Sequence, residues 1–384
     1  MFTYSYTSPV QRGSRFGLGV APIQAANPKR LAKPAELVGF GLSNVGFETS
    51  KFNNVIIQEI KKKNSKTELK LEKIKIKIDL KKFQFFLSTS NPKLEYNSTK
   101  VPVTEIKIYS KISKIFKKRL EISKIIFSTK SFKTQNIKKI AIHIKPSNFK
   151  TYLLNNIQGG EIEKALFDLS IDKNFKITDY KASGAIKNIN SKILKDLTIK
   201  NISFNFKVDN DLILINSVNA NYKGILISNG SIDVEKKKEI EIKGKFNSLF
   251  ELREDQLSKF FTKVDFFKKN KIVAEGTLFH DFNLKINNNF KIIDYNYKSS
   301  GEIAQAQVNL KNGYKNNFIE KKIKKIFFKK NKLEIIFNQQ NKNLLLFDGL
   351  YSFNESNYKI IKVKYNLEKK NKNYLIDLNL TENI

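Results

Sequence analysis

Regular alternation of Lys or Glu with Ile or Phe runs through most of this 384-residue chain. Residues 73–78 read Lys-Ile-Lys-Ile-Lys-Ile, and residues 202–208 and 239–243 likewise place an apolar side chain at every second position. Successive side chains of a β-strand point to opposite faces, so a period of two predicts strands with one apolar and one polar face. Residues 45–384 are therefore predicted to form an elongated, mainly β structure.

Residues 1–44 differ in composition from the rest of the chain. They contain 4 of the 7 prolines and 3 of the 5 arginines, but only 2 of the 66 lysines. The glycines at 17–19 and 39–41 lack the third glycine of a dinucleotide-binding fingerprint, and neither pair lies between a clear strand and a helix. We therefore predict two regions, an irregular and compositionally foreign segment 1–44 and a β domain 45–384.

Few helices are expected. Residues 52–64 carry apolar side chains at three- and four-residue spacing, residues 147–157 end before Gly159-Gly160, and residues 249–261 are a third candidate. The candidate strands of the N-terminal part are 69–80 with a bulge at 72–73, 82–88, 105–111, 121–128 and 140–145. From residue 161, strands recur roughly every 10–15 residues, with turns predicted at 209–211 and 229–230.

One internal similarity suggests repetition. Residues 176–180 lead into Ser183-Gly184, and the similar residues 291–295 lead into Ser300-Gly301. A repeated strand and turn favours a modular, solenoid-like sheet. Chance similarity in a chain of biased composition is the alternative.

The net charge of +35 invites a polyanion-binding function. The positive charge is almost all Lys, however, and it is spread along nearly every strand. Bidentate recognition of guanine or phosphate favours Arg. We interpret the charge as a solvated strand face in a chain with an AT-rich coding bias. A selected anionic partner is the alternative, and we expect no specific nucleic acid.

Residues suited to catalysis are scarce. His143 and His280 lie far apart in the sequence, and the chain has no Cys, so no metal site is expected. The carboxylates alternate with Lys on strands and are interpreted as cross-strand charge pairs, for example at Glu239, Glu241, Asp172 and Asp233. We predict that the protein is not an enzyme and uses no cofactor.

The apolar face of the strands remains as the candidate site. A second sheet or a helix normally buries such a face, which would give a sandwich core. With few helices available, one long twisted sheet could instead curl around a continuous apolar channel. The pattern alone leaves both open.

Several segments together resemble a known superfamily. They are Gly46-Phe47-Glu48-Thr49 leading through a short helix to residues 73–76, Lys145-Pro146-Ser147-Asn148-Phe149, Gly159-Gly160-Glu161-Ile162, and the unit ending at Ser183-Gly184. This pattern over residues 45–384 resembles the AsmA-like envelope proteins (AsmA, TamB and YhdP), and is most similar to the YhdP-type central region.

The resemblance implies a twisted antiparallel sheet curled into a hydrophobic groove, as in a β-taco. It also implies a periplasmic protein of a Gram-negative bacterium, anchored in the inner membrane, that transports phospholipid between the membranes in outer-membrane biogenesis. Phospholipid acyl chains are the expected partners. The candidate groove residues are Ile74, Ile76, Ile78, Ile202, Phe204, Phe206 and Val208.

Two features depart from this superfamily. No stretch of the chain approaches the roughly 20 apolar residues of a membrane anchor, and segment 1–44 stands where the anchor is expected. The expected C-terminal part is also missing, so we expect a truncated or mis-joined product of a longer protein. The competing interpretation is a basic, β-rich scaffold that binds polyanions and no lipid.

Overall fold

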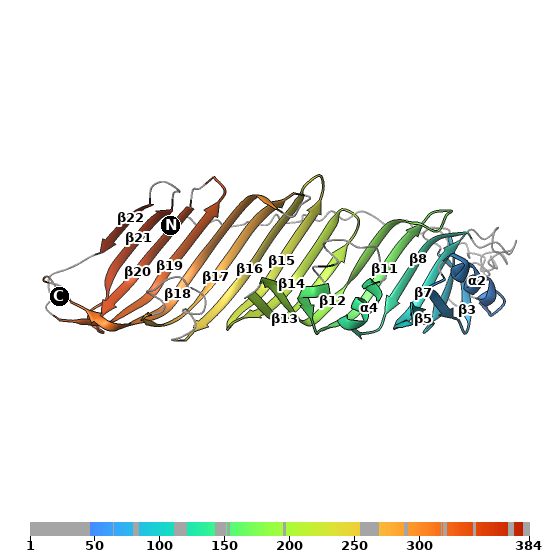
Figure 1. Cartoon of the computed structure of the whole chain (residues 1–384), viewed down its shortest axis with the longest axis horizontal. Coiled ribbons are helices and arrows are strands. Elements are labelled where there is room, and N and C mark those ends of the chain that lie inside the picture. Colours follow the sequence, from blue (N-terminus) through green and yellow to red (C-terminus); the bar gives the residue numbers. More distant parts are fainter. Residues whose placement is uncertain are drawn as a thin grey trace, which may run out of the picture.

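The computed structural model describes residues 47–63, 65–79, 84–110, 121–142, 151, 154–194, 197–253, 269–287, 291–315, 317, 321–340, 343–367 and 372–378. Of these residues, 74% lie in strands and 9% are helical. One long antiparallel sheet holds every strand except β2, β5 and β6, which form a second, small sheet. The strands follow one another obliquely along an elongated molecule (Figure 1). The prediction of a mainly β, elongated antiparallel sheet is confirmed.

The N-terminal part of the described chain consists of short strands and helices. Helix α2 spans Asn53–Lys63 and helix α4 spans Thr134–Ile142. The strands are β1 (Phe47–Thr49), β2 (Thr67–Lys70), β3 (Ile74–Asp79), β4 (Gln84–Ser90), β5 (Lys93–Tyr96), β6 (Thr99–Val101), β7 (Val103–Ser110), β8 (Ile122–Thr129), β9 (Phe132–Lys133) and β10 (Ile157–Gln158).

The C-terminal part consists of long strands. They are β11 (Glu161–Ile171), β12 (Ile177–Leu194), β13 (Leu197–Val208), β14 (Leu212–Tyr222), β15 (Ile225–Lys236), β16 (Ile240–Leu252), β17 (Lys271–Ile286), β18 (Ile292–Tyr314), β19 (Ile323–Asn338), β20 (Asn343–Phe353), β21 (Lys359–Leu367) and β22 (Lys372–Leu378). Strand β18 has 23 residues, several times the usual length of about 5–6. Strands this long let one sheet form both walls of a concave surface.

The pairing order is simple. Each strand from β11 to β22 pairs with the next strand in sequence. On its other side β11 pairs with β8, and the sheet continues through β7, β4 and β3 to β1. Strands β3 and β22 lie near opposite ends of the molecule, so the sheet is open (Figure 1).

Bulges bend four neighbouring strands. Asn188, Asn201, Ser217 and Asn229 have φ angles of 55°, 53°, 57° and 52°, and the strand register shifts beside them. A bulge bends its strand and increases the local twist. Because the four sites are adjacent in register, they bend the sheet together. The turn predicted at 229–230 is therefore wrong, since these residues form a bulge inside β15.

The turn predicted at residues 209–211 is confirmed. Asp209 connects β13 to β14, and its Oδ1 atom accepts hydrogen bonds from the N–H groups of Asp211 at 3.0 Å and Leu212 at 2.8 Å. These two backbone donors lower the pKa of Asp209, the one on Leu212 contributing most. The hairpin is thus closed by a local side-chain contact that was visible in the sequence.

Helix α2 confirms the helix predicted at 52–64, but the bulge predicted at 72–73 is wrong. Strands β2 and β3 belong to different sheets. Asn53, at the start of α2, donates its Nδ2 protons to the carbonyl oxygens of Leu71 at 3.1 Å and Glu72 at 3.0 Å. These contacts hold the connection away from both sheets and break the strand.

Two other predicted elements differ from the structure. Residues 140–142 end helix α4 instead of starting a strand, because Ile137, Ile140 and Ala141 fall at helical spacing. Residues 249–252 are the end of β16, paired with β17, and are not helical. The remainder of candidate helix 249–261 beyond residue 253 lies outside the described residues. Of candidate helix 147–157, residues 151 and 154–156 are described and helical.

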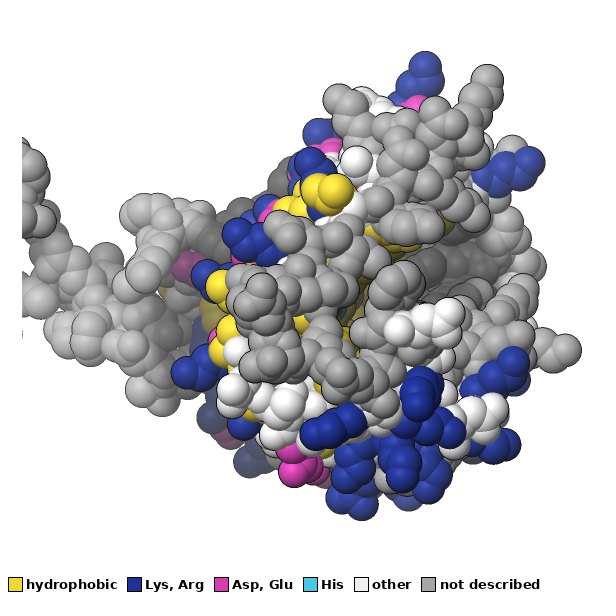
Figure 2. Space-filling view, turned by 90° about the vertical axis from the view of Figure 1, so that its left-hand side faces the viewer, with side chains coloured by type: hydrophobic (Ala, Val, Ile, Leu, Met, Phe, Trp, Pro, Cys, Tyr) yellow, Lys and Arg dark blue, Asp and Glu magenta, His cyan; other side chains and the backbone are white. Residues whose placement is uncertain are grey.

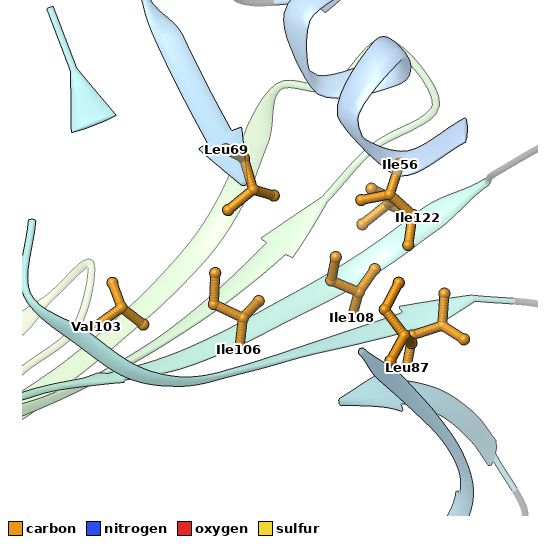
Figure 3. Packing of buried hydrophobic residues seen from close by; sticks show 8 residues of the cluster. Ile56, Leu69, Leu87, Val103, Ile106, Ile108 and Ile122 are labelled. Carbon is orange, nitrogen blue, oxygen red and sulfur yellow. The ribbon is translucent and has the colours of Figure 1, made fainter. Parts of the chain in front are cut away.

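A compact hydrophobic cluster closes the N-terminal end of the sheet (Figure 3). Ile56 of α2 and Leu69 of β2 pack from above onto Leu87, Ile106 and Ile108 of the long sheet. All five side chains are buried. Burying an aliphatic side chain of this size stabilises a fold by roughly 1.5–3 kcal/mol. Helix α2 and the small sheet therefore cap one end of the long sheet.

Candidate functional site

One face of the long sheet is apolar along its length. Directly opposed residues of an antiparallel sheet share a face. Successive opposed residues on β3, β4, β7, β8, β11 and β12 are Ile76, Leu87, Ile108, Ile125, Leu169 and Tyr180. From β13 to β18, opposed residues on the same face are Val208, Ile213, Val234, Ile242, Leu284 and Tyr295.

The sheet is curved around this face. Figure 2 looks along the molecule from the β22 end and shows hydrophobic side chains in the hollow between the two long edges, with Lys side chains on the outside. We call the hollow the trough, and the set of opposed residues given above, with their neighbours two positions along each strand, the apolar face. The opposite side of the sheet is the outer face.

The predicted groove residues all lie on the apolar face, in two groups. Ile202, Phe204, Phe206 and Val208 are half-buried on β13, while Lys207 between them is exposed on the outer face. The registers of β12 and β13 place Phe206 opposite Gly184 and Phe204 opposite Ile186. This alternation is the one that the sequence predicts. Their contact with a lipid remains a prediction.

The second group of predicted residues lies at the capped end. Ile74 is buried in the cluster beneath α2, and Ile76 packs against that cluster. Ile78 is half-buried and lies opposite Phe85. Ile74 therefore contributes to the closed core, whereas the residues on β13 line the uncapped part of the sheet.

An apolar cavity of about 440 Å³ lies beside the cap. Its walls come from the small sheet, from α2 and from strands of the long sheet, and include Leu69, Leu94, Ile106, Phe127 and Leu169. Phe127 stacks on Phe167 with ring centroids 4.6 Å apart. The apolar face thus continues from the trough into a partly enclosed space at this end.

Lys and acidic residues form ion pairs on the outer face. Lys124 lies 2.7 Å from Asp168 across β8 and β11, and Lys298 lies 2.8 Å from Glu334 across β18 and β19. Such pairs contribute about 0–1 kcal/mol each when exposed to solvent. They neutralise only part of the positive charge, so the outer face remains basic.

Some of the carboxylates named from sequence have other roles. Glu241 pairs with Lys243 on its own strand at 3.2 Å, and Lys243 and Asn283 lower the pKa of Glu241. Asp172 closes the β11–β12 hairpin by accepting the N–H groups of Asn174 and Lys176. The prediction of a cross-strand pair is therefore wrong for Asp172, since its carboxylate is used by the local turn.

A hydrogen-bonded polar cluster interrupts the apolar face. His280 of β17 bonds through Nε2 to Ser248 Oγ of β16 at 2.7 Å and through Nδ1 to Tyr297 Oη of β18 at 2.8 Å. Ser299 lies directly opposite His280 and is also buried. We call Ser248, His280, Tyr297 and Ser299 the polar cluster. Burial lowers the pKa of His280 and raises the pKa of Tyr297.

The sequence predicts that His280 is a strand histidine that is either hydrogen-bonded or solvent-facing. Its contacts show the first, but the cluster as a whole was missed. The available signal was the alternation itself, because Leu278, His280 and Phe282 place a polar residue in the apolar phase of β17. Ser248 and Ser299 give the same signal on β16 and β18. Only the strand register brings these positions together. His143 lies outside the described residues.

A further buried polar group lies on β19. Asn331 is 0% exposed, and neither its Oδ1 nor its Nδ2 atom has a hydrogen-bond partner among the described residues. The phenol oxygen of the buried Tyr351 on β20 also has none. An unpaired buried polar group costs about 1–3 kcal/mol, so this end of the apolar face has unmet hydrogen-bonding capacity.

No group of His, Asp and Glu side chains in the described part of the chain is arranged to hold a metal ion. Among the described helices, none has the length and apolarity needed to cross a membrane. No protein family, curated protein or solved structure matches this chain.

Proposed function

We propose that this protein is an envelope protein that carries phospholipid between the inner and outer membranes, with the acyl chains lying in the trough. The observation that carries the proposal is the continuity of the apolar face, which runs in register through the strands of one open sheet. A sandwich core would need a second sheet against this face. The only other sheet among the described residues is the small one formed by β2, β5 and β6.

The mechanism is passive. Transfer of an acyl chain from water to an apolar surface contributes about 0.8 kcal/mol per buried CH₂ group. Many side chains share this contribution, so no single residue is indispensable, and the lipid can move along the trough between similar environments. The phosphate headgroup would stay at the rim, where Lys side chains of the outer face are near.

The resemblance to AsmA-like proteins supports the proposed location. A periplasmic protein anchored in the inner membrane, acting in outer-membrane biogenesis, needs an elongated shape of this kind. Genomic sequence that encodes a hydrophobic segment in frame before codon 45 would support this part of the proposal. A continuous native segment 1–44 in close relatives would contradict it.

Native mass spectrometry of the purified chain, with extraction and identification of bound lipid, tests the proposal. Phospholipid that remains bound at high salt is the expected result, because burial of acyl chains does not depend on screened charge. A lipid-free protein that cannot be loaded with phospholipid would contradict the proposal.

The basic outer face favours a second candidate, a β-rich scaffold that binds polyanions. Exposed Lys side chains such as Lys207 on β13, Lys243 on β16 and Lys298 on β18 project from that face. Binding through them would weaken steeply as salt increases. The same mass-spectrometric sample, titrated with an oligonucleotide at low and high salt, separates the two candidates.

A further inference from the structure

The polar cluster contains one hydrogen-bond donor more than its own acceptors use. At neutral pH the imidazole of His280 carries one N–H, because burial lowers its pKa below 6.5. Ser248, His280 and Tyr297 then hold one proton each, and two hydrogen bonds join them. Whichever tautomer forms, one proton of the three stays unused. If this proton is donated to the hydroxyl oxygen of Ser299, one donor is still in excess, because the Ser299 hydroxyl adds a proton of its own.

The described residues that are paired with the polar cluster carry no charge. Outside the cluster, the residues directly opposite its members on the apolar face are Ile227, Phe246, Leu278, Phe282, Ile335 and Phe337. The imidazole also stacks on Phe246, with ring centroids 4.3 Å apart. An ionised group buried here would lack a counter-charge and would cost several kcal/mol. The spare donor is therefore suited to an uncharged acceptor.

Apolar side chains of the protein would lie on both sides of an acceptor bound at the polar cluster. Along β17, Leu278 precedes His280, and Phe282 and Leu284 follow it on the same face. An acyl lipid has an uncharged acceptor, the carboxylic ester carbonyl, directly attached to a long apolar chain. Its phosphate is separated from the ester and can remain outside the trough. An ester carbonyl on a hydrocarbon chain therefore matches a single hydrogen-bond donor that is surrounded by apolar side chains.

We infer that the polar cluster of Ser248, His280, Tyr297 and Ser299 donates a hydrogen bond to the ester carbonyl of an acyl lipid lying in the trough. The inference rests on the proposed function and adds the part of the lipid that is recognised. The cluster selects ester-linked over ether-linked chains and sets the position at which a lipid pauses along the apolar face.

A competition between two lipids tests this inference on the full chain. Dipalmitoyl phosphatidylcholine and its dihexadecyl ether analogue share a headgroup and nearly the same hydrocarbon, but only the first has ester carbonyls. Equal amounts are offered to the protein, and the bound ratio is read by native mass spectrometry. One neutral hydrogen bond predicts a preference of about fivefold for the ester lipid.

An apolar variant supplies the second arm. Ser248→Ala, His280→Phe, Tyr297→Phe and Ser299→Ala together remove the polar cluster, and the new ring at 280 can stack on Phe246. This variant should bind both lipids with a ratio near one. The matched control is Tyr295→Phe, which removes a hydroxyl two residues away on the same face and should keep the preference.

The outcomes separate the inference from the proposed function. Equal binding of the two lipids by the unmodified chain overturns the inference and leaves the lipid trough intact. Failure of both lipids to bind overturns the inference and the proposed function together. If the apolar variant does not fold, equal binding of the two lipids by the unmodified chain still overturns the inference.

Discussion

The imidazole of His280 lies against the ring of Phe246, with the ring centroids 4.3 Å apart and the planes inclined by 17°. Together with hydrogen bonds at both ring nitrogens, this stack holds a titratable group on an apolar surface. The consequence is a neutral imidazole, because protonation would add a charge that neither Phe246 nor the neighbouring hydroxyl groups balance.

Stability should fall on acidification because of His280. Burial lowers its folded-state pKa below 6.5, so the unfolded chain binds the proton more readily. The contribution of neutral His280 to folding stability is therefore fully present above pH 6.5. It is lost as the pH falls from 6.5 through the folded-state pKa of His280. Thermal unfolding between about pH 7.5 and pH 5.5 measures it. His280→Gln should flatten this pH dependence, and an unchanged slope in the variant would contradict the assignment.

Replacing Asn331 by Leu should stabilise the lipid-free protein. Both amide atoms of Asn331 are buried without partners in the described part of the chain, and Leu has the same branching at Cγ without their desolvation cost. We expect a gain of about 1–2 kcal/mol in the free energy of unfolding, measured in urea. Ser352→Ala is the comparison, because the hydroxyl of Ser352 donates to the carbonyl of Ser356 at 2.6 Å and its loss should destabilise. A loss of stability in Asn331→Leu would mean that the amide has a partner.

A charge in the trough should abolish lipid retention. Phe204→Asp combined with Phe206→Asp places two carboxylates on the apolar face of β13. The matched control is Asn205→Asp, which adds one carboxylate on the exposed outer face between them. Native mass spectrometry should find lipid on the control and at most a tenth as much on the double variant, since each buried carboxylate costs several kcal/mol. Equal lipid on both would argue against the trough.

Ile56 should be essential to the cap. Its side chain is 1% exposed and packs between α2 and the long sheet, so Ile56→Ala removes buried methylene groups and leaves a cavity. We expect a loss of about 2–5 kcal/mol. Hydrogen exchange should locate the loosening in α2, β2 and β3. Gln58→Ala on the exposed side of the same helix serves as the control and should change stability little. Protection in α2 that survives Ile56→Ala would show that the cap has another anchor.

Alternation was enough to predict which face of each strand is apolar. Phe204 and Phe206 lie on the face that their spacing assigns, as do Ile74 and Ile76. Local turn chemistry was likewise readable at Asp209, because its side chain bonds to backbone groups only two and three residues away. Predictions failed where a local pattern has two solutions. Asn229-Gly230 is equally suited to a tight turn or a bulge, and the neighbouring strands decide between them.

The sequence by itself determined the strand period, the apolar and charged faces and the mainly β class, because these depend on spacings of two to four residues. The tertiary structure alone decided that Ile74 is capped by α2 while Phe206 lies in the trough, and that Ser248, His280 and Tyr297 meet. These residues come from different elements, and only the register of paired strands and the packing of the cap bring such distant positions within contact distance.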